Sequence, residues 1–141
     1  MMLRQTILIR EDLGFPRGLL AAQVAHLHME YFRQLILQRG EECVTTSSGG
    51  GLRFPTSSEL REWLKTPYTF VHGVPNREVL EHFKQKAQAA EVPYAEWSDT
   101  VYIDISETQR EAFPAVVVGI AFAPTESDII KTIIGDLPLL K

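Results

Sequence analysis

The sequence predicts an α/β fold, in which helices cover both faces of a mostly parallel, mixed sheet. Three observations support this prediction. Four apolar runs have the composition of strands, at residues 6–9, 68–74, 100–105 and 115–122. Helical patterns separate the first three runs, and strands that alternate with helices favour a parallel sheet. The last two runs are adjacent in the chain and can form one antiparallel pair. The 141 residues show no internal repeat and predict a single domain over residues 1–141.

The first strand and the helix after it show the clearest pattern. The run "TILI" is apolar and largely β-branched, as buried strands are. Pro16 lies near the predicted helix start, where a missing N–H is tolerated. The helix is expected to reach about Gln38, with Gly40 as its stop. Apolar residues at 3-4 spacing should face the core, namely Leu20, Val24, Leu27, Tyr31 and Leu35.

The middle of the chain predicts a loop, a short helix, a strand and a capped helix. Residues 43–58 are rich in Ser, Thr and Gly, and are expected to form a mobile loop. Thr56 and Glu59 have capping-box spacing for a short helix, "ELREWLK". The strand "YTFVHGV" follows, and Asn76 is expected to cap a helix over residues 77–90.

The last third predicts two strands and a closing helix. The run "TVYIDI" alternates like a half-exposed strand, whereas "AVVVGIAF" is nearly all apolar, like a strand buried on both faces. Thr125 is expected to cap the last helix, and Gly135 to end it.

Composition and charge limit the class of protein. The chain is 45% hydrophobic and 23% charged, as soluble globular proteins are. It has no apolar run near the roughly 18 residues of a membrane span and no signal-peptide pattern, so we expect a cytoplasmic protein. Cys43 is the only cysteine, which excludes an internal disulfide and a thiolate metal cluster.

The net charge of −4 argues against an extended basic surface. Residues 1–75 carry eight Lys/Arg and seven Asp/Glu, whereas residues 76–141 carry six and eleven. A local phosphate-binding surface is therefore expected in the first half.

A ligand site is expected where the first strand ends. Open α/β sheets bind ligands at the carboxyl ends of parallel strands, and helix N-termini favour anions. Arg17, in the turn "GFPRG", would strengthen an anion site there, although a solvated surface arginine fits the same position. The turn is neither a Walker A loop nor a dinucleotide fingerprint.

Two polar residues inside the first helix are candidates for one wall of this site. Gln23 and His26 are three residues apart and share a helix face, although helix histidines are more often packed or exposed than catalytic. His28 points elsewhere, so the two histidines do not form a metal pair. The sequence also lacks HExxH spacing, a Cys/His cluster and a GxSxG elbow.

Asp104, at the end of "TVYID", is the candidate carboxylate. It could act as a base or position a water molecule, although an Asp that opens a turn is also common. Thr108 and Gln109 alone would be interpreted as polar loop residues.

At these residues the chain resembles the type 2 peptidyl-tRNA hydrolases, the bacterial–archaeal–eukaryotic type. Its "DLGFPRGLLAAQVAH" is similar to the family motif D-(L/I)-x-M-G-K-G-K-(I/M)-A-A-Q-x-A-H, without a gap. Its "DISETQ" is similar to D-A-G-x-T-Q, and "AFAP" follows in register. Arg17 stands at the motif's first lysine and Leu19 at its second. About five extra residues around "EWSDT" precede Asp104.

The resemblance implies a compact three-layer α/β/α domain with a four-stranded mixed sheet, usually a homodimer. It implies cleavage of the ester between a peptide and tRNA, with no metal or organic cofactor. By the same resemblance, the catalytic residues would be Asp104, Thr108 and His26, and the substrate-binding residues Arg17, Gln23 and Gln109.

Two other functions stay open. Leu19 and the acidic second half suit a catalytically weak or inactive family member that binds tRNA or a protein. An apolar pocket mouth would suit an enzyme that acts on a less charged small molecule.

Overall fold

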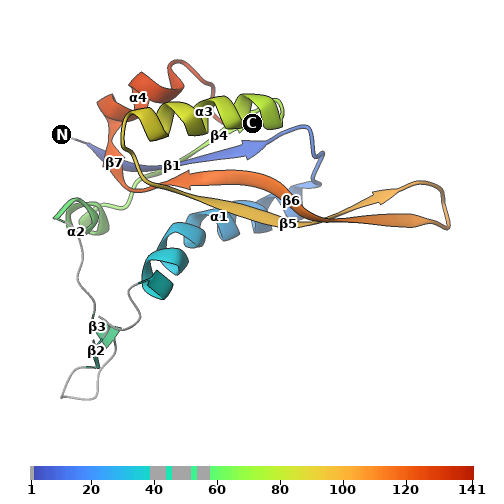
Figure 1. The fold of residues 1–141 in the computed structure, drawn as a ribbon, viewed down its shortest axis with the longest axis horizontal. Coiled ribbons are helices and arrows are strands. Elements are labelled where there is room, and N and C mark those ends of the chain that lie inside the picture. The colour runs from blue at the N-terminus through green and yellow to red at the C-terminus, as the bar shows by residue number, and fades with distance from the viewer. Residues whose placement is uncertain (1, 39–43, 46–51, 54–57) are drawn as a thin grey trace.

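The computed structural model describes residues 2–38, 44–45, 52–53 and 58–141 of the chain (Figure 1). The secondary structure elements follow in chain order: β1 (Leu3–Arg10), α1 (Arg17–Gln38), β2 (Val44–Thr45), β3 (Leu52–Arg53), α2 (Ser58–Lys65), β4 (Thr69–Val74), α3 (Arg77–Ala89), β5 (Tyr94–Asp104), β6 (Arg110–Phe122), β7 (Thr125–Glu126) and α4 (Ser127–Ile134).

The main sheet is mixed, with the strand order β4-β1-β6-β5. Among the strands that the structure describes, only β1 and β4 pair in parallel, with Gln5 opposite Thr69. Strand β6 is antiparallel to both β1 and β5, and the short β7 adds a fifth strand by pairing with the start of β1. The prediction of a mostly parallel sheet is therefore wrong. The parallel neighbours β1 and β4 are connected through helices. Strands β5 and β6 are instead joined by a hairpin, which makes neighbouring strands antiparallel.

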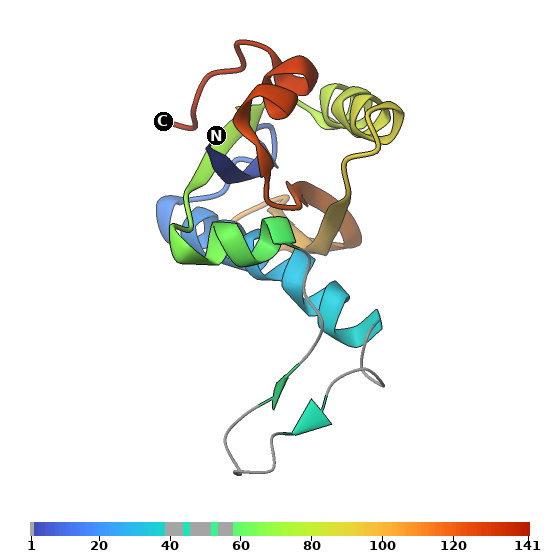
Figure 2. The same ribbon diagram turned by 90° about the vertical axis from the view of Figure 1, so that its left-hand side faces the viewer.

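Helices cover both faces of the sheet, which confirms the predicted α/β/α layers (Figure 2). On one face α3 and α4 pack against Leu8, Ile120 and Phe122. On the other face α1 places Leu27 against Ile7, Ile9, Val118 and Ala121. Of the strand predicted to be buried over residues 115–122, residues 117–122 are buried, whereas Ala115 is exposed and Val116 is partly buried. Within the described residues, no helix combines the length and apolar character that crossing a membrane requires.

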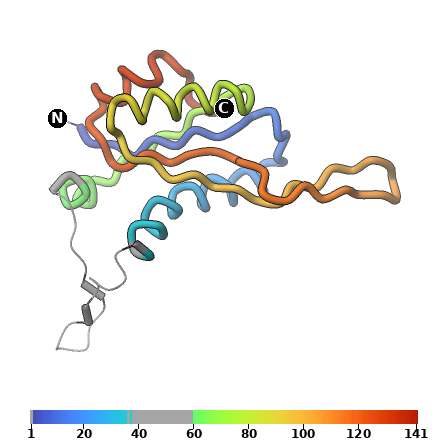
Figure 3. Tube along the Cα trace, in the orientation of Figure 1, coloured from blue at the N-terminus to red at the C-terminus, as the bar shows by residue number. Residues whose placement is uncertain are grey.

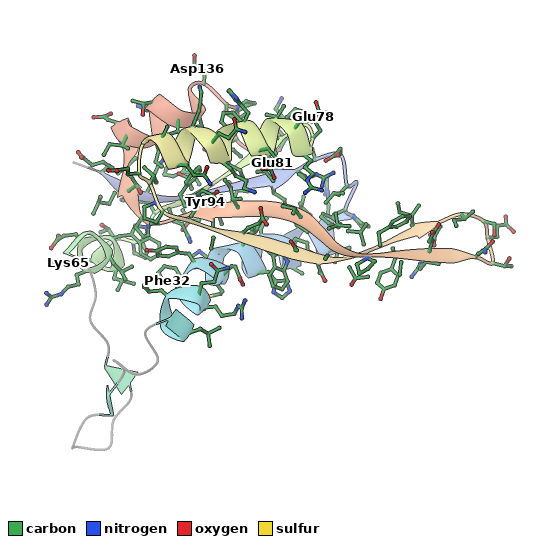
Figure 4. The ribbon with its side chains drawn as sticks, viewed as in Figure 1. Phe32, Lys65, Glu78, Glu81, Tyr94 and Asp136 are labelled. Carbon is green, nitrogen blue, oxygen red and sulfur yellow. The ribbon has the colours of Figure 1, made fainter. Side chains whose placement is uncertain are left out.

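Helix α1 follows its prediction closely. It begins directly after Pro16, whose carbonyl oxygen accepts a hydrogen bond from the Leu20 N–H at 2.8 Å. The 3-4 stripe faces inward, with Leu27 fully buried and Leu20 and Val24 packed beside it. Further along, Phe32 lies on the side of α1 that faces α2, where its ring stacks on that of Trp63 (Figure 4).

Two of the predicted caps are present and one is not. Asn76 caps α3, because its Oδ1 accepts a hydrogen bond from the Val79 N–H at 3.0 Å. Gly135 ends α4 with a φ of 58°, a conformation that glycine adopts readily. The predicted cap at Thr125 is wrong, because Thr125 lies in β7 and its hydroxyl donates to the Ala123 carbonyl instead.

The predictions for residues 43–58 fall mostly outside the described residues. Gly40, Cys43 and Thr56 also lie outside the described residues. Within the segment, β2 and β3 form a short antiparallel pair. The short helix predicted after it is present as α2.

Strands β5 and β6 are longer than predicted and form an arm. Past Asp99 and Val116 the two strands pair only with each other, and every residue from 102 to 115 is exposed. We call residues 99–116 the hairpin arm. It extends beyond the helices at one end of the molecule (Figures 1 and 3). The pairing shifts register between Trp97 and Ser98 and again between Asp99 and Val101, so irregularities separate the arm from the rest of the sheet.

Candidate active site

A pocket of about 560 Å³ lies between the start of α1 and the base of the hairpin arm. One wall comes from the turn after β1 and the first turns of α1. The opposite wall comes from β5 and the first residue of β6. The lining residues are Leu13, Gly14, Phe15, Pro16, Leu19 and Gln23 on the first wall, and Asp99, Thr100, Val101, Tyr102, Asp104 and Arg110 on the second.

The turn that the sequence selected as a ligand site lines one wall of this pocket. The turn after β1 follows the carboxyl end of a strand in a parallel pair, where α/β sheets place ligands. Gly14 in this turn has a φ of 63°, which lets the chain reverse before the helix begins. The second wall comes from an antiparallel hairpin, whose Asp104 was grouped with this turn by the resemblance alone.

Gln23 is 3% exposed and both ends of its amide are bonded to β5. Its Nε2 donates to Asp99 Oδ2 at 2.9 Å, and its Oε1 accepts from Trp97 Nε1 at 2.8 Å. The Thr100 N–H donates to Asp99 Oδ1 at 2.8 Å. The buried amide thus fixes the direction of a carboxylate that lines the pocket.

His26 lies on the same side of α1 but outside the pocket lining. Its ring stacks on the Trp97 indole, with centroids 4.7 Å apart and planes inclined by 18°. His28 points elsewhere, as predicted, and its Nδ1 lies 2.5 Å from Gln5 Oε1. Gln23 and His26 therefore meet at one tryptophan, and only Gln23 reaches the pocket.

Asp104 lines the pocket and forms an ion pair with Arg110, the residue opposite it in the hairpin. Arg110 Nε donates to Asp104 Oδ1 at 2.8 Å. Both side chains are well exposed, at 67% for Asp104 and 63% for Arg110. The hydrogen bond to Asp104 raises the pKa of the Arg110 guanidinium above its ordinary value, so this group stays charged.

The other three predicted site residues lie away from the pocket lining. Thr108 and Gln109 are in the turn at the tip of the arm, where the Gln109 carbonyl accepts a hydrogen bond from the Ile105 N–H at 2.9 Å. Arg17 is the first residue of α1 and is exposed. The structure brings Gln23 and Asp104 together, but not Arg17, His26, Thr108 or Gln109.

Four polar residues of the pocket lining were missed from the sequence: Asp99, Thr100, Tyr102 and Arg110. Asp99 lies in the extra segment "EWSDT", and Arg110 follows directly after "DISETQ". A hairpin centred on residues 105–109 would have placed Arg110 directly opposite Asp104, with Tyr102 two positions along the same strand. The strand prediction stopped at residue 105 and resumed at 115, so this pairing was not visible.

Comparison with known proteins relates the chain to one family. The sequence profile of the family described as Peptidyl-tRNA hydrolase PTH2 matches residues 3–140. A peptidyl-tRNA hydrolase from Saccharolobus solfataricus is 26% identical over 99% of this chain and 100% of its own length. Another, from Sulfolobus acidocaldarius, is 26% identical over 98% and 100%.

A solved structure of a protein of unknown function from Agrobacterium tumefaciens is similar in fold. Its TM-score is 0.53 at 15% identity, and the match covers all of both chains. The fold, the pocket between the two motifs and the match over residues 3–140 lead to one conclusion. The chain belongs to the peptidyl-tRNA hydrolase PTH2 family.

Proposed function

We propose that this protein hydrolyses the ester bond between peptide and tRNA in peptidyl-tRNA, which releases free peptide and free tRNA. One observation carries the proposal: the pocket joins the start of α1 to Asp104, so residues of both family motifs face one space. A carboxylate in such a pocket can hold a water molecule and accept its proton.

In this proposal Asp104 activates the attacking water. The water oxygen bonds to the ester carbonyl carbon while its proton passes to Asp104. When the intermediate collapses, the bond to the ribose oxygen breaks and that oxygen takes the proton. Gln23 supports the wall through Asp99, and His26 supports it through Trp97.

The exposed residues around the pocket would contact the tRNA. Arg17, at the N-terminus of α1, suits a phosphate, because the helix dipole and the guanidinium both attract anions. Thr108 and Gln109, at the tip of the arm, offer hydrogen-bonding groups to the same substrate.

The test is hydrolysis of purified peptidyl-tRNA, measured as released peptide. Asp104→Asn should lower the rate by about 10² or more, because an amide cannot accept the proton. Glu107→Gln is the matched control, since Glu107 is an exposed carboxylate of the same arm that does not line the pocket. No turnover above buffer at high protein concentration would refute the proposal.

Leu19 favours a second candidate, a binding module without turnover. It lines the pocket, 47% exposed, where the family motif has its second lysine. Under this alternative the protein retains tRNA binding, measured by fluorescence anisotropy, but releases no peptide. Loss of both binding and turnover would favour an enzyme that acts on a different small molecule.

We further propose that the protein works in the cytoplasm as a homodimer. The exposed apolar side chains of the arm support self-association, namely Tyr102, Ile103, Ile105 and Phe113. Sedimentation equilibrium tests it, and a monomer at micromolar concentration would contradict it.

A further inference from the structure

We infer that Arg110 supplies the positive charge of this pocket and stabilises the oxyanion that forms when water attacks the ester carbonyl. The inference rests on the proposed hydrolysis and assigns the group that stabilises its anionic intermediate. It starts from the charges in the pocket. The charged side chains among the described lining residues are Asp99, Asp104 and Arg110, so Arg110 is the one cation among them.

The opposite wall offers no positive side chain within the described lining. Leu19 is apolar, and Arg17 lies outside the lining. Arg110 and Leu19 line the same pocket from opposite sides. A positive charge on β6 can therefore attract an anion in the pocket as a lysine at position 19 would. This placement accounts for a leucine at that motif position in a pocket that handles an anionic intermediate.

The guanidinium of Arg110 has hydrogen-bond donors that no residue of the described part of the chain uses. Its Nε donates to Asp104 Oδ1 at 2.8 Å, and its two terminal nitrogens form no hydrogen bond with another residue in the described part of the chain. Arginine carries five N–H donors in a planar fork, so four remain for a ligand. The bond through Nε also fixes the plane in which those donors lie.

The hydrogen bond between Arg110 and Asp104 also places the guanidinium close to the expected site of the reaction. Asp104 would hold the water that attacks the carbonyl carbon. The carbonyl electron pair moves onto its oxygen as the new bond forms, so negative charge develops about one bond length from the attacked atom. A guanidinium bonded to Asp104 lies beside that oxygen. Donors that meet developing charge lower the barrier, and loss of one such donor costs about 10² to 10³ in rate.

The experiment compares kcat and KM for four proteins on peptidyl-tRNA: the wild type, Arg110→Gln, Arg110→Gln combined with Leu19→Lys, and Arg77→Gln. Arg77 is the matched control, an exposed arginine at the start of α3, away from the pocket. We expect Arg110→Gln to lower kcat by about 10² or more with little change in KM. Leu19→Lys should then restore at least about tenfold, because it returns a cation to the same pocket.

The double variant distinguishes two roles of Arg110: a positive charge that acts on the substrate, and a side chain that only positions Asp104. If Arg110 only positions Asp104, Leu19→Lys restores nothing, and the inference is wrong. If the loss falls on KM alone, Arg110 binds a tRNA phosphate in the ground state, and the oxyanion role is also wrong. An unchanged kcat refutes it directly.

Two further measurements keep the result interpretable. Circular dichroism and thermal melting check that each variant is folded, and Arg110→Lys, which keeps the charge but loses the fork, should lie between the wild type and Arg110→Gln. A wild-type protein that leaves the ester intact refutes the proposed function, and this role with it. Turnover that is indifferent to Arg110 refutes this role alone.

Discussion

Replacing Gln23 with leucine should destabilise the fold through one buried amide. Leucine has a similar volume and leaves almost no cavity, so the change removes hydrogen bonds and little else. The lost bonds are those to Trp97 Nε1 and Asp99 Oδ2, at 2.8 and 2.9 Å. Both partners are half-buried and lose their bond to Gln23.

The two bonds set the magnitude. A neutral hydrogen bond contributes about 1 kcal/mol to stability and one to a charged group about 1.5–3 kcal/mol. Two effects reduce the loss of stability. Water can reach part of the Asp99 carboxylate, and leucine does not have the desolvation cost of a buried amide. We therefore expect a loss of about 2 kcal/mol, which at this chain length lowers Tm by about 8 °C.

The assay is urea denaturation of Gln23→Leu, Trp97→Phe and the double variant. Because Trp97→Phe removes the same N–H donor, the double-mutant cycle should give a coupling energy of about 1 kcal/mol. Gln85→Leu is the matched control, since Gln85 is exposed on α3, and it should change stability by about 0.5 kcal/mol at most.

Two results would refute this reasoning. A loss below about 0.5 kcal/mol for Gln23→Leu would mean that water replaces both bonds at no cost. Strictly additive effects of Gln23→Leu and Trp97→Phe would mean that the two side chains do not interact in solution.

Two further predictions concern the sheet itself. Burial lowers the pKa of His72 below its ordinary value of 6.5, so the unfolded chain takes up the proton first and stability falls as the pH drops below about 6.5. Urea midpoints from about pH 8 to about pH 5 should show this loss in the wild type but not in His72→Gln, and parallel profiles would contradict it. Gly119→Ala should cost about 3 kcal/mol or more, because its Cβ would collide with the Leu8 carbonyl oxygen on the neighbouring strand. Gly18→Ala, which meets open space in α1, should be neutral or stabilising by about 0.5 kcal/mol, and equal losses for the two would show that the collision relaxes.

The sequence was most informative where a pattern is local. The 3-4 stripe of α1, the Asn76 cap and the Gly135 stop each depend on residues within a few positions of one another. Each is set by backbone geometry that the neighbouring residues determine. The helices, the four longer strands and the α/β/α layers could therefore be predicted, whereas the short strands β2, β3 and β7 were not.

The hairpin arm could not be predicted in the same way. Ser98, Asp99 and Glu111 are polar, and Pro114 lacks an N–H, so propensity argues against strands there. Pairing between β5 and β6 overrides that preference, with Asp99 opposite Val116. Local propensity does not report which partner a strand will find.

Of the residues predicted for the site, Gln23 and Asp104 line the pocket, but their partners could not be predicted, for a related reason. Gln23 lies more than 70 positions from Trp97 and Asp99, and no spacing rule connects them. Asp104 could be chosen from its motif, but its partner Arg110 became visible only once the two strands were paired.

The register shifts at Trp97/Ser98 and Asp99/Val101 have a consequence for motion. They lie just before the exposed residues 102–115, so they divide the hairpin into a part packed in the main sheet and an exposed part. Backbone amides beyond the second shift are protected only by their partner strand, and their local opening costs much less than global unfolding. Hydrogen exchange should therefore rise in a step past residue 101. Because Asp104 and Arg110 lie on the exposed part of the hairpin and Leu19 lies on α1, each opening of the arm changes the width of the pocket.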